Sequence, residues 1–350
     1  MSLDPSTLLR ERARFFAAVR EFYVEHDFLE VYTPSLLKHC EYDVNNPQFE
    51  TAVVGLDGRE IRRAYLPISP EYQMKALLSE HGGPLFQIAQ FFRNGNFSDK
   101  HSPCFFGVEW YEPGADYHRS MQVTEQAIRH TLERLGRDRW TWRGSVVDGD
   151  ASWQKVDVSD AVCELLELDM AQMMVLPSMV EAMRRRSSYP SDETLRAAGK
   201  RLSTWEDHFD WCVDVLLDER RLSHHEPAFL MNFPSSHELG EMGEMVPGEP
   251  NKVQRFELYI CGVELCNGHT ELTREQELTS RFARIRAEMP PNKARDVYPD
   301  IAKISAGIPP SSGVAIGLDR LFMITLGLDS LHEIHPPALR ADLLVPEDVT

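Results

Sequence analysis

The segment 256–272, FELYICGVELCNGHTEL, constrains the fold more than any other part of the chain. Aromatic and β-branched residues surround acidic ones on both sides of Cys261-Gly262, a pattern that predicts a hairpin with a two-residue turn. In that register Glu257 and Glu264 are diagonal neighbours on one face, roughly 7–8 Å apart, where two carboxylates can bind a divalent cation. A slip by one residue would separate them. Taken alone, the segment is explained equally well as an edge hairpin with solvated acidic residues.

The composition is that of an ordinary globular protein of 350 residues with a formal net charge of −18. This charge argues against a broad nucleic-acid-binding surface, which needs clustered lysine and arginine. No apolar run approaches the roughly 20 residues of a membrane span, and the charged N-terminus has no signal-peptide core. Six scattered cysteines without a CxxC pair indicate a reducing compartment. We therefore expect a cytoplasmic protein with no membrane partner.

Apolar periodicity predicts several helices and leaves one long loop. A helix over 7–26 precedes a short strand that ends at Pro34. Another helix begins at Ser69-Pro70, read as an N-cap followed by proline, and ends at a Gly-Gly pair. Further helical segments are expected over 117–136, 159–224 and 273–288. The loop 235–252, rich in Gly, Glu and Met, is a candidate lid or a disordered connector.

The segment 84–113 predicts a strand, a long loop and a second strand. The first strand ends in Arg93 and the loop carries Lys100 and His101, groups suited to phosphate oxygens. A surface loop with a few basic residues explains the same pattern. On the second strand, period two forms one face from Phe105, Gly107, Glu109 and Tyr111. A glutamate beside a tyrosine, with a glycine leaving space, indicates a small pocket for a cationic group.

Near the C-terminus, SSGVAIGLDRLFMITLG predicts a glycine-spaced strand that runs directly into an apolar helix. Asp319 and Arg320 fall in the first turn of that helix. A guanidinium beside the positive end of a helix forms a favourable anion site. The glycine spacing by itself carries little specificity.

Three of these segments, in this order, resemble the three signature motifs of class II aminoacyl-tRNA synthetases. They are the helix and strand ending at Pro34, the strand pair around Arg93 and Glu109, and the strand and helix around Arg320. The resemblance covers the chain from about residue 7 to about residue 330. SPEYQMK, FRN…KHSP…VEWY, RFELY…GVELCNGHTELT and SGVAIGLDRL are similar to the lysine-type members. Among these they are most similar to the short lysyl-tRNA synthetase paralogues that ligate (R)-β-lysine to elongation factor P.

The resemblance implies an α+β fold with an antiparallel β-sheet flanked by helices. It also implies a single catalytic domain over 1–350, with a helical insertion at about 159–224, and a homodimer formed through the first motif. Lysyl-tRNA synthetases carry an anticodon-binding domain ahead of the catalytic one. Here the first motif already begins by about residue 7, so we expect no such domain and regard tRNA as an unlikely partner.

The resemblance also assigns roles to individual residues. ATP would be bound by Arg93, Asn94, Lys100, His101, Phe105, Glu257, Glu264 and Arg320. Arg93 and Arg320 would be the catalytic groups, and Glu257 and Glu264 would hold Mg²⁺. The amino acid would be bound by Ser69, Glu71, Glu109, Tyr111, Asn267, His269, Glu271, Ala315 and Gly317.

The implied reaction has two steps. The carboxylate of a lysine-like amino acid attacks the α-phosphorus of ATP and pyrophosphate leaves. A lysine side chain of elongation factor P then attacks the mixed anhydride. Ala315 stands where the tRNA-charging members have glycine, and its methyl narrows the pocket in a way that favours β-lysine over α-lysine.

Two departures from the family pattern leave alternatives open. The second motif reads Phe92-Arg93-Asn94-Gly95 where the family has Phe-Arg-x-Glu, which affects contacts to the base of ATP. His269 stands where lysine-type enzymes have Phe. The chain therefore remains compatible with a different acceptor, such as a small molecule, a carrier or tRNA. It also remains compatible with a catalytically silent amino-acid sensor.

Overall fold

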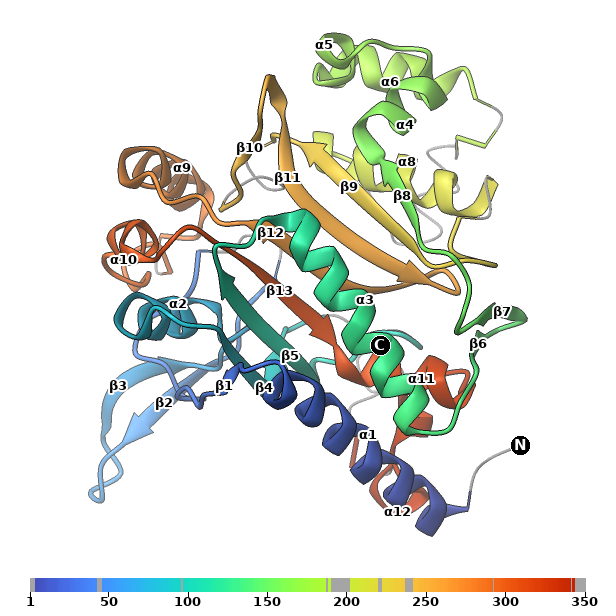
Figure 1. The fold of residues 1–350 in the computed structure, drawn as a ribbon. Helices are drawn as coiled ribbons and strands as arrows, with labels where there is room; N and C mark the ends of the chain where they lie inside the picture. The colour runs from blue at the N-terminus through green and yellow to red at the C-terminus, as the bar shows by residue number, and fades with distance from the viewer. Residues whose placement is uncertain are drawn as a thin grey trace.

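A computed structural model describes residues 4–42, 46–95, 97–186, 188–189, 202–219, 222–236, 242–291, 293–340 and 342–343 (Figure 1). Among these residues nine strands form one sheet, with helices on both faces and a helical group beyond one edge. This α+β arrangement agrees with the prediction. No helix of the described residues has the length and apolar character that a membrane crossing requires.

The sheet has the strand order β1-β4-β5-β13-β12-β11-β9-β8, and β10 pairs with β11. The strands are β1 Leu29–Glu30, β4 Leu85–Phe92, β5 Cys104–Pro113, β8 Gln154–Asp157, β9 Ala228–Pro234, β10 Met245–Val246, β11 Glu249–Ile260, β12 Val263–Thr270 and β13 Ser311–Gly317. The pairs from β4 to β9 are antiparallel, as predicted. The two outer pairs, β1–β4 and β8–β9, are parallel, so the whole sheet is mixed. Both join strands through long connections, which parallel pairing requires.

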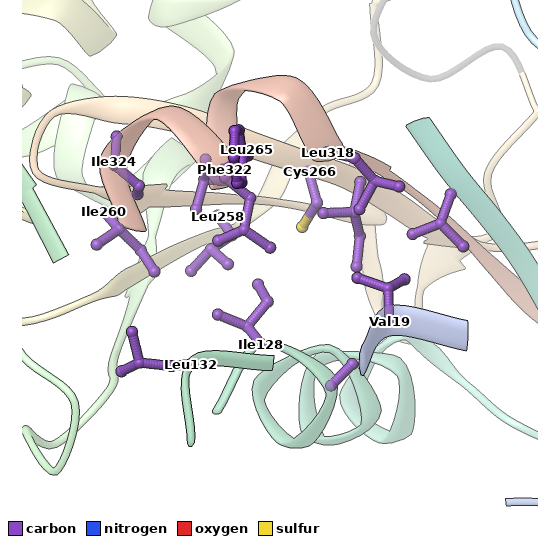
Figure 2. Packing of buried hydrophobic residues seen from close by; sticks show 14 of the residues in the cluster. Val19, Ile128, Leu132, Leu258, Ile260, Leu265, Cys266, Leu318, Phe322 and Ile324 are labelled. Atoms are coloured by element: carbon purple, nitrogen blue, oxygen red, sulfur yellow. The ribbon is translucent and has the colours of Figure 1, made fainter. Parts of the chain in front are cut away.

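One face of the sheet packs against three helices: α1 Pro5–Glu25, α3 Tyr117–Arg134 and α11 Leu318–Leu326. The first two confirm the predicted helices over 7–26 and 117–136. Figure 2 shows this core, in which Val19 of α1 and Ile128 of α3 lie below Leu258 and Ile260 of β11. The strands therefore turn alternate residues toward this core and leave the others on the opposite face.

The opposite face carries α2 Glu71–His81, whose Met74 and Leu78 pack against Leu85 and Tyr111 of the sheet. The predicted N-cap is shifted by one residue, because Pro70 is the N-cap and the helix begins at Glu71. Ser69 Oγ accepts a hydrogen bond from the backbone N–H of Glu71 at 3.2 Å. Beside α2 lies α10 Ile301–Gly307, and α9 Glu275–Glu288 lies on the other side of α10 (Figure 1).

The predicted helical insertion forms a separate cluster beyond β8 and β9 (Figure 1). Its described helices are α4 Val158–Leu166, α5 Met170–Met173, α6 Leu176–Arg184 and α8 Trp205–Glu219. They bury a core of their own, including Val162 and Phe209, against Leu230 and Phe233 of β9. The insertion is thereby fixed to the edge of the sheet. Smaller elements are β2 Glu50–Val54, β3 Glu60–Tyr65, β6 Arg139–Trp142, β7 Ser145–Asp148, η1 Leu331–Ile334 and α12 Pro337–Arg340.

The segment 235–252 was expected to be a lid or a disordered loop, but its described part pairs with the sheet. Residues 237–241 lie outside the described part of the chain. Met245–Val246 pairs with β11, and β11 already begins at Glu249. Gly243 forms an isolated bridge with Glu271. The described part is a sheet extension because its backbone groups pair with neighbouring strands.

Candidate active site

The hairpin of β11 and β12 contains an irregularity that determines which side chains meet. Ile260 pairs with Val263, which confirms the two-residue turn. Tyr259 then pairs with Glu264 and Leu258 with Cys266, so Leu265 is an extra residue in β12. Such a β-bulge changes the alternation of side chains along the strand.

The bulge brings Glu264 and Asn267 to one face although they are three positions apart. Glu257 pairs with Asn267 on that face, and Tyr259 lies beside it, with its hydroxyl donating to Glu257 Oε2 at 2.9 Å. Leu265 and Cys266 are both buried in the core with α3 and α11. Glu257 and Glu264 therefore share a face, as the hairpin register predicted.

Each of these two carboxylates has an arginine beside it. Arg255 Nη2 lies 2.6 Å from Glu257 Oε1, and Arg320 Nη1 lies 3.2 Å from Glu264 Oε2. Burial raises the pKa of Glu257 to about 7, with Arg255 opposing the shift and the charge of Glu264 adding to it. Burial also acts to raise the pKa of Glu264, but Arg320 and Arg93 outweigh it and hold that pKa below its ordinary value.

A first cavity, of about 230 Å³, lies against β5, β12 and the start of α11; we call it the Arg320 cavity. Its predicted site residues are Arg93, Lys100, His101, Phe105, Glu264, Asn267, Ala315, Gly317 and Arg320. Arg320 donates to the carbonyl oxygens of Lys100 and Glu264, both at 2.9 Å. The Arg93 guanidinium lies 5.5 Å from the centre of the Phe105 ring. The cavity thus has several cationic groups and one aromatic wall.

Two residues near Arg320, Asp319 and His101, differ in charge and in role. Asp319 accepts hydrogen bonds from Arg12 of α1 at 2.8 Å and from the backbone of Phe106 at 3.0 Å. These two hydrogen bonds fix the start of α11 to α1 and β5, and Asp319 also lines the cavity. Burial, followed by the charges of Arg320 and Lys100, lowers the pKa of His101 to about 4. His101 is consequently neutral at pH 7.

A second cavity, of about 330 Å³, lies between α2, the sheet and α8; we call it the Glu109 cavity. Its predicted site residues are Ser69, Glu71, Arg93, Glu109, Tyr111, Asn267, His269 and Ala315. Tyr111 donates to Glu109 Oε1 at 2.7 Å. Burial raises the pKa of Glu109 to about 8, and the negative charge of Glu71 adds to the shift. Glu109 is thus mostly protonated at pH 7 when the cavity holds no cation.

The two cavities adjoin each other. Arg93, Asn267 and Ala315 line both of them. Asn267 pairs with Ala315 in the sheet, and Ala315 pairs with Glu109 on its other side. Two of the three shared residues therefore lie on neighbouring strands, β12 and β13, whose relative register is determined by backbone hydrogen bonds.

Not every predicted site residue lines a cavity. Asn94 and Glu257 line neither one. Gly317, expected beside the amino acid, lines the Arg320 cavity instead. Glu271 lies behind the wall of the Glu109 cavity, and its side chain is only 1% exposed.

The residues that sequence reasoning missed are Lys75, Arg255, Glu206 and Asp210. Lys75 is fully buried, and its Nζ lies 2.7 Å from Glu71 Oε1 and 2.7 Å from Glu271 Oε2. Its position four residues after Glu71 on an apolar helix face was an available signal. A sequence signal was also available for Arg255, because it lies two residues before Glu257 and therefore on the same face of the strand.

Glu206 and Asp210 come from α8 of the insertion and line the Glu109 cavity. Nothing in the local sequence around them indicates contact with a site built by strands far away in the chain. Only the packing of the insertion on β9 brings them there.

The chain is similar to known proteins over nearly its whole length. The family model described as tRNA synthetases class II (D, K and N) matches residues 3–337. The elongation factor P–(R)-β-lysine ligase of Vibrio vulnificus (strain YJ016) is 30% identical over 93% of this chain and 94% of its own length. The ligases of the same name from Haemophilus influenzae (strain PittGG) and Erwinia tasmaniensis are 29% and 30% identical over 95% and 93% of this chain, and over 95% and 93% of their own lengths.

Proposed function

Because the chain belongs to the class II tRNA synthetases of the D, K and N type, we propose that it is an ATP-dependent amino acid–protein ligase. It activates a lysine-like amino acid, with β-lysine favoured, as the aminoacyl-adenylate. It then transfers the aminoacyl group to a lysine side chain of elongation factor P, the acceptor that appears in the names of its relatives.

The observation that carries this proposal is the junction of the two cavities at Arg93, Asn267 and Ala315. ATP in the Arg320 cavity and an amino acid in the Glu109 cavity would meet at this junction. The amide of Asn267 suits the amino-acid carboxylate, and Arg93 suits the α-phosphate. Holding the two reactants side by side supplies most of what an in-line attack requires.

The Arg320 cavity suits the rest of the nucleotide. Arg320 and Lys100 provide positive charge for the outer phosphates, and the neutral His101 provides a hydrogen bond instead of a charge. Phe105 offers a face on which adenine can stack. Arg93 neutralises charge that develops at the α-phosphorus, a form of electrostatic stabilisation.

The acidic pair suits Mg²⁺. Glu257 and Glu264 present carboxylate oxygens on one face of the hairpin of β11 and β12, and such oxygens are the ligands that Mg²⁺ prefers. The mutual repulsion that helps raise the pKa of Glu257 is relieved by a cation between them. When bound, Mg²⁺ would neutralise phosphate charge.

The Glu109 cavity suits a substrate with two ammonium groups. Glu71, Glu109 and Glu271 with the buried Lys75 leave two negative charges once Glu109 is ionised. A diamino acid supplies two positive charges, so each buried charge gains a partner. A monoamino acid would leave one carboxylate unpaired and is expected to bind poorly.

We propose further that the chain forms one catalytic domain over 1–350, works in the cytoplasm, and is a homodimer through its first motif. Leu29 and Tyr32, which follow α1 in that motif, are 50% and 76% exposed. Exposed apolar residues at that position support a partner surface. The names of the relatives support a protein acceptor rather than tRNA.

The test is amino-acid-dependent ATP–pyrophosphate exchange with (R)-β-lysine, α-lysine, ornithine and neutral amino acids, followed by transfer to elongation factor P. We expect strong exchange with β-lysine and weak exchange with α-lysine. The Glu271→Gln variant should lose exchange and keep ATP binding. Exchange without transfer to elongation factor P would indicate another acceptor. ATP binding with no exchange for any amino acid would favour a sensor.

A further inference from the structure

The second step of the proposed reaction lacks a group that removes a proton from the acceptor amine. An ε-ammonium group cannot attack a carbonyl carbon until it has lost one proton, and the attacking nitrogen loses another as the amide forms. General-base groups contribute typically 10²–10⁴-fold to such steps. None of the residues assigned so far is free for this work.

The carboxylates of the Glu109 cavity differ in what already contacts them. Glu71 is paired with Lys75, and Glu109 is buried and accepts the hydroxyl of Tyr111. Two more carboxylates, Glu206 and Asp210, project from α8 one helical turn apart. Of these four side chains, only that of Asp210 is in the exposed class, so a lysine arriving from outside can reach it.

Within the described residues no hydrogen bond or salt bridge engages Asp210, although Arg255 lies within electrostatic range. Arg255 Nε in turn donates to Asn267 Oδ1 at 3.2 Å, and Asn267 lines the junction of the two cavities. Asp210, Arg255 and Asn267 thus line the same cavity. Glu206, in the first turn of α8, lies one turn before Asp210.

We propose that Asp210 is the general base for transfer, a role that rests on the proposed ligase function. The neutral ε-amine nitrogen attacks the carbonyl carbon of the aminoacyl-adenylate and forms the C–N bond. The Asp210 carboxylate accepts the proton that this nitrogen loses. The bond from the carbonyl carbon to the phosphate oxygen breaks, and AMP leaves with the electron pair.

The electrostatic surroundings suit this role. Although Asp210 is accessible, it lies on a concave wall where crowding by protein raises its pKa to about 6. Arg255 opposes this shift, whereas Asp214, Asp207 and Glu264 add to it. Glu206 lies on the same helix face. Asp210 is thus ionised at pH 7, with a higher proton affinity than an ordinary aspartate.

The experiment separates the two chemical steps in the full-length protein. Exchange of pyrophosphate measures adenylate formation, and a single turnover of pre-formed β-lysyl-adenylate with saturating elongation factor P measures transfer. We expect Asp210→Ala to leave exchange within about twofold of the wild type and to slow transfer about 100-fold. Added formate, a small carboxylate base, should restore part of the transfer rate.

Two variants serve as controls. Asp214→Ala removes a carboxylate one turn further along α8 that does not line the cavity, and it should slow transfer far less than Asp210→Ala does. Glu206→Gln removes the other α8 carboxylate of the cavity and should change transfer by less than threefold.

Several outcomes would overturn the assignment. Equal slowing by Glu206→Gln and Asp210→Ala would mean that the α8 carboxylates attract the acceptor without taking its proton. Unchanged transfer in Asp210→Ala, or slowing that formate does not relieve, would also reject Asp210 as the base. Absence of exchange in the wild-type protein would reject the proposed function itself, and it is therefore measured first.

Discussion

Lys75 Nζ lies 2.7 Å from Glu271 Oε2 and the same distance from Glu71 Oε1, so one buried ammonium joins the first turn of α2 to the end of β12. Burial alone would lower the pKa of Lys75, but Glu271 and Glu71 hold it above its ordinary value. Burial also acts to raise the pKa of Glu271, yet His269 and Lys75 lower it to about 2. The ion pair is therefore charged on both sides at neutral pH.

Replacing Lys75 by methionine should destabilise the fold by about 3–5 kcal/mol, because it leaves the buried Glu271 and the partly buried Glu71 without their shared cation. Urea unfolding monitored by tryptophan fluorescence measures this change. Lys155→Met, at an exposed position on β8, is the matched control and should change stability by less than about 0.5 kcal/mol. A loss below about 1 kcal/mol in Lys75→Met would show that the pair contributes little.

Amino-acid activation should depend on pH through Glu109, whose pKa burial raises to about 8. Below that pH the carboxyl is protonated and offers no charge to a substrate ammonium. The kcat/KM for β-lysine in the exchange assay should therefore fall as the pH is lowered from 8 to 6. In Glu109→Gln this dependence should disappear, together with most of the activity. The same slope in wild type and variant would assign the titration to another group.

Substituting alanine at Gly313 should close the Glu109 cavity. A methyl group there would overlap the Tyr111 ring and lie 3.0 Å from Glu271 Oε1. We expect the KM for the amino acid to rise at least about tenfold while the affinity for ATP changes little, since Gly313 lines the Glu109 cavity and not the Arg320 cavity. Gly307→Ala is the control, because the nearest atom would be Ser79 Cβ at 3.9 Å. An unaltered KM in Gly313→Ala would contradict the assignment of this cavity.

Removing the methyl group of Ala315 should shift the choice of amino acid. Ala315 lies at the junction of the cavities and pairs with Glu109 in the sheet. One methyl group in a packed site is worth about 0.8 kcal/mol, or roughly a fourfold change. The ratio of kcat/KM for α-lysine to that for β-lysine should therefore rise about fourfold in Ala315→Gly. An unchanged ratio would mean that selectivity lies elsewhere.

The order of the main helices and strands was predictable, because the sequence pattern that indicates each element lies within that element. Apolar periodicity predicted α1 and α3, and the Cys261-Gly262 turn predicted the hairpin register beside it. The strand, loop and strand around Arg93 and the strand that runs into α11 were predicted for the same reason. Local sequence constrains backbone conformation over one or two turns, and these features require no more.

The sequence by itself thus determined most of the longer helices, the strands on both sides of Arg93, the hairpin turn and the shared face of Glu257 and Glu264. The tertiary structure alone decided three further features. The bulge at Leu265 changes the alternation of side chains along β12, so that Glu264 and Asn267 lie on the same face. The approach of α2 to β12 gives Lys75 its second carboxylate, and the packing of α8 on β9 brings Asp210 to the cavity. Each depends on contacts between segments distant in the chain, where the energy of burying a charge or a side chain is set by neighbours that no local pattern specifies.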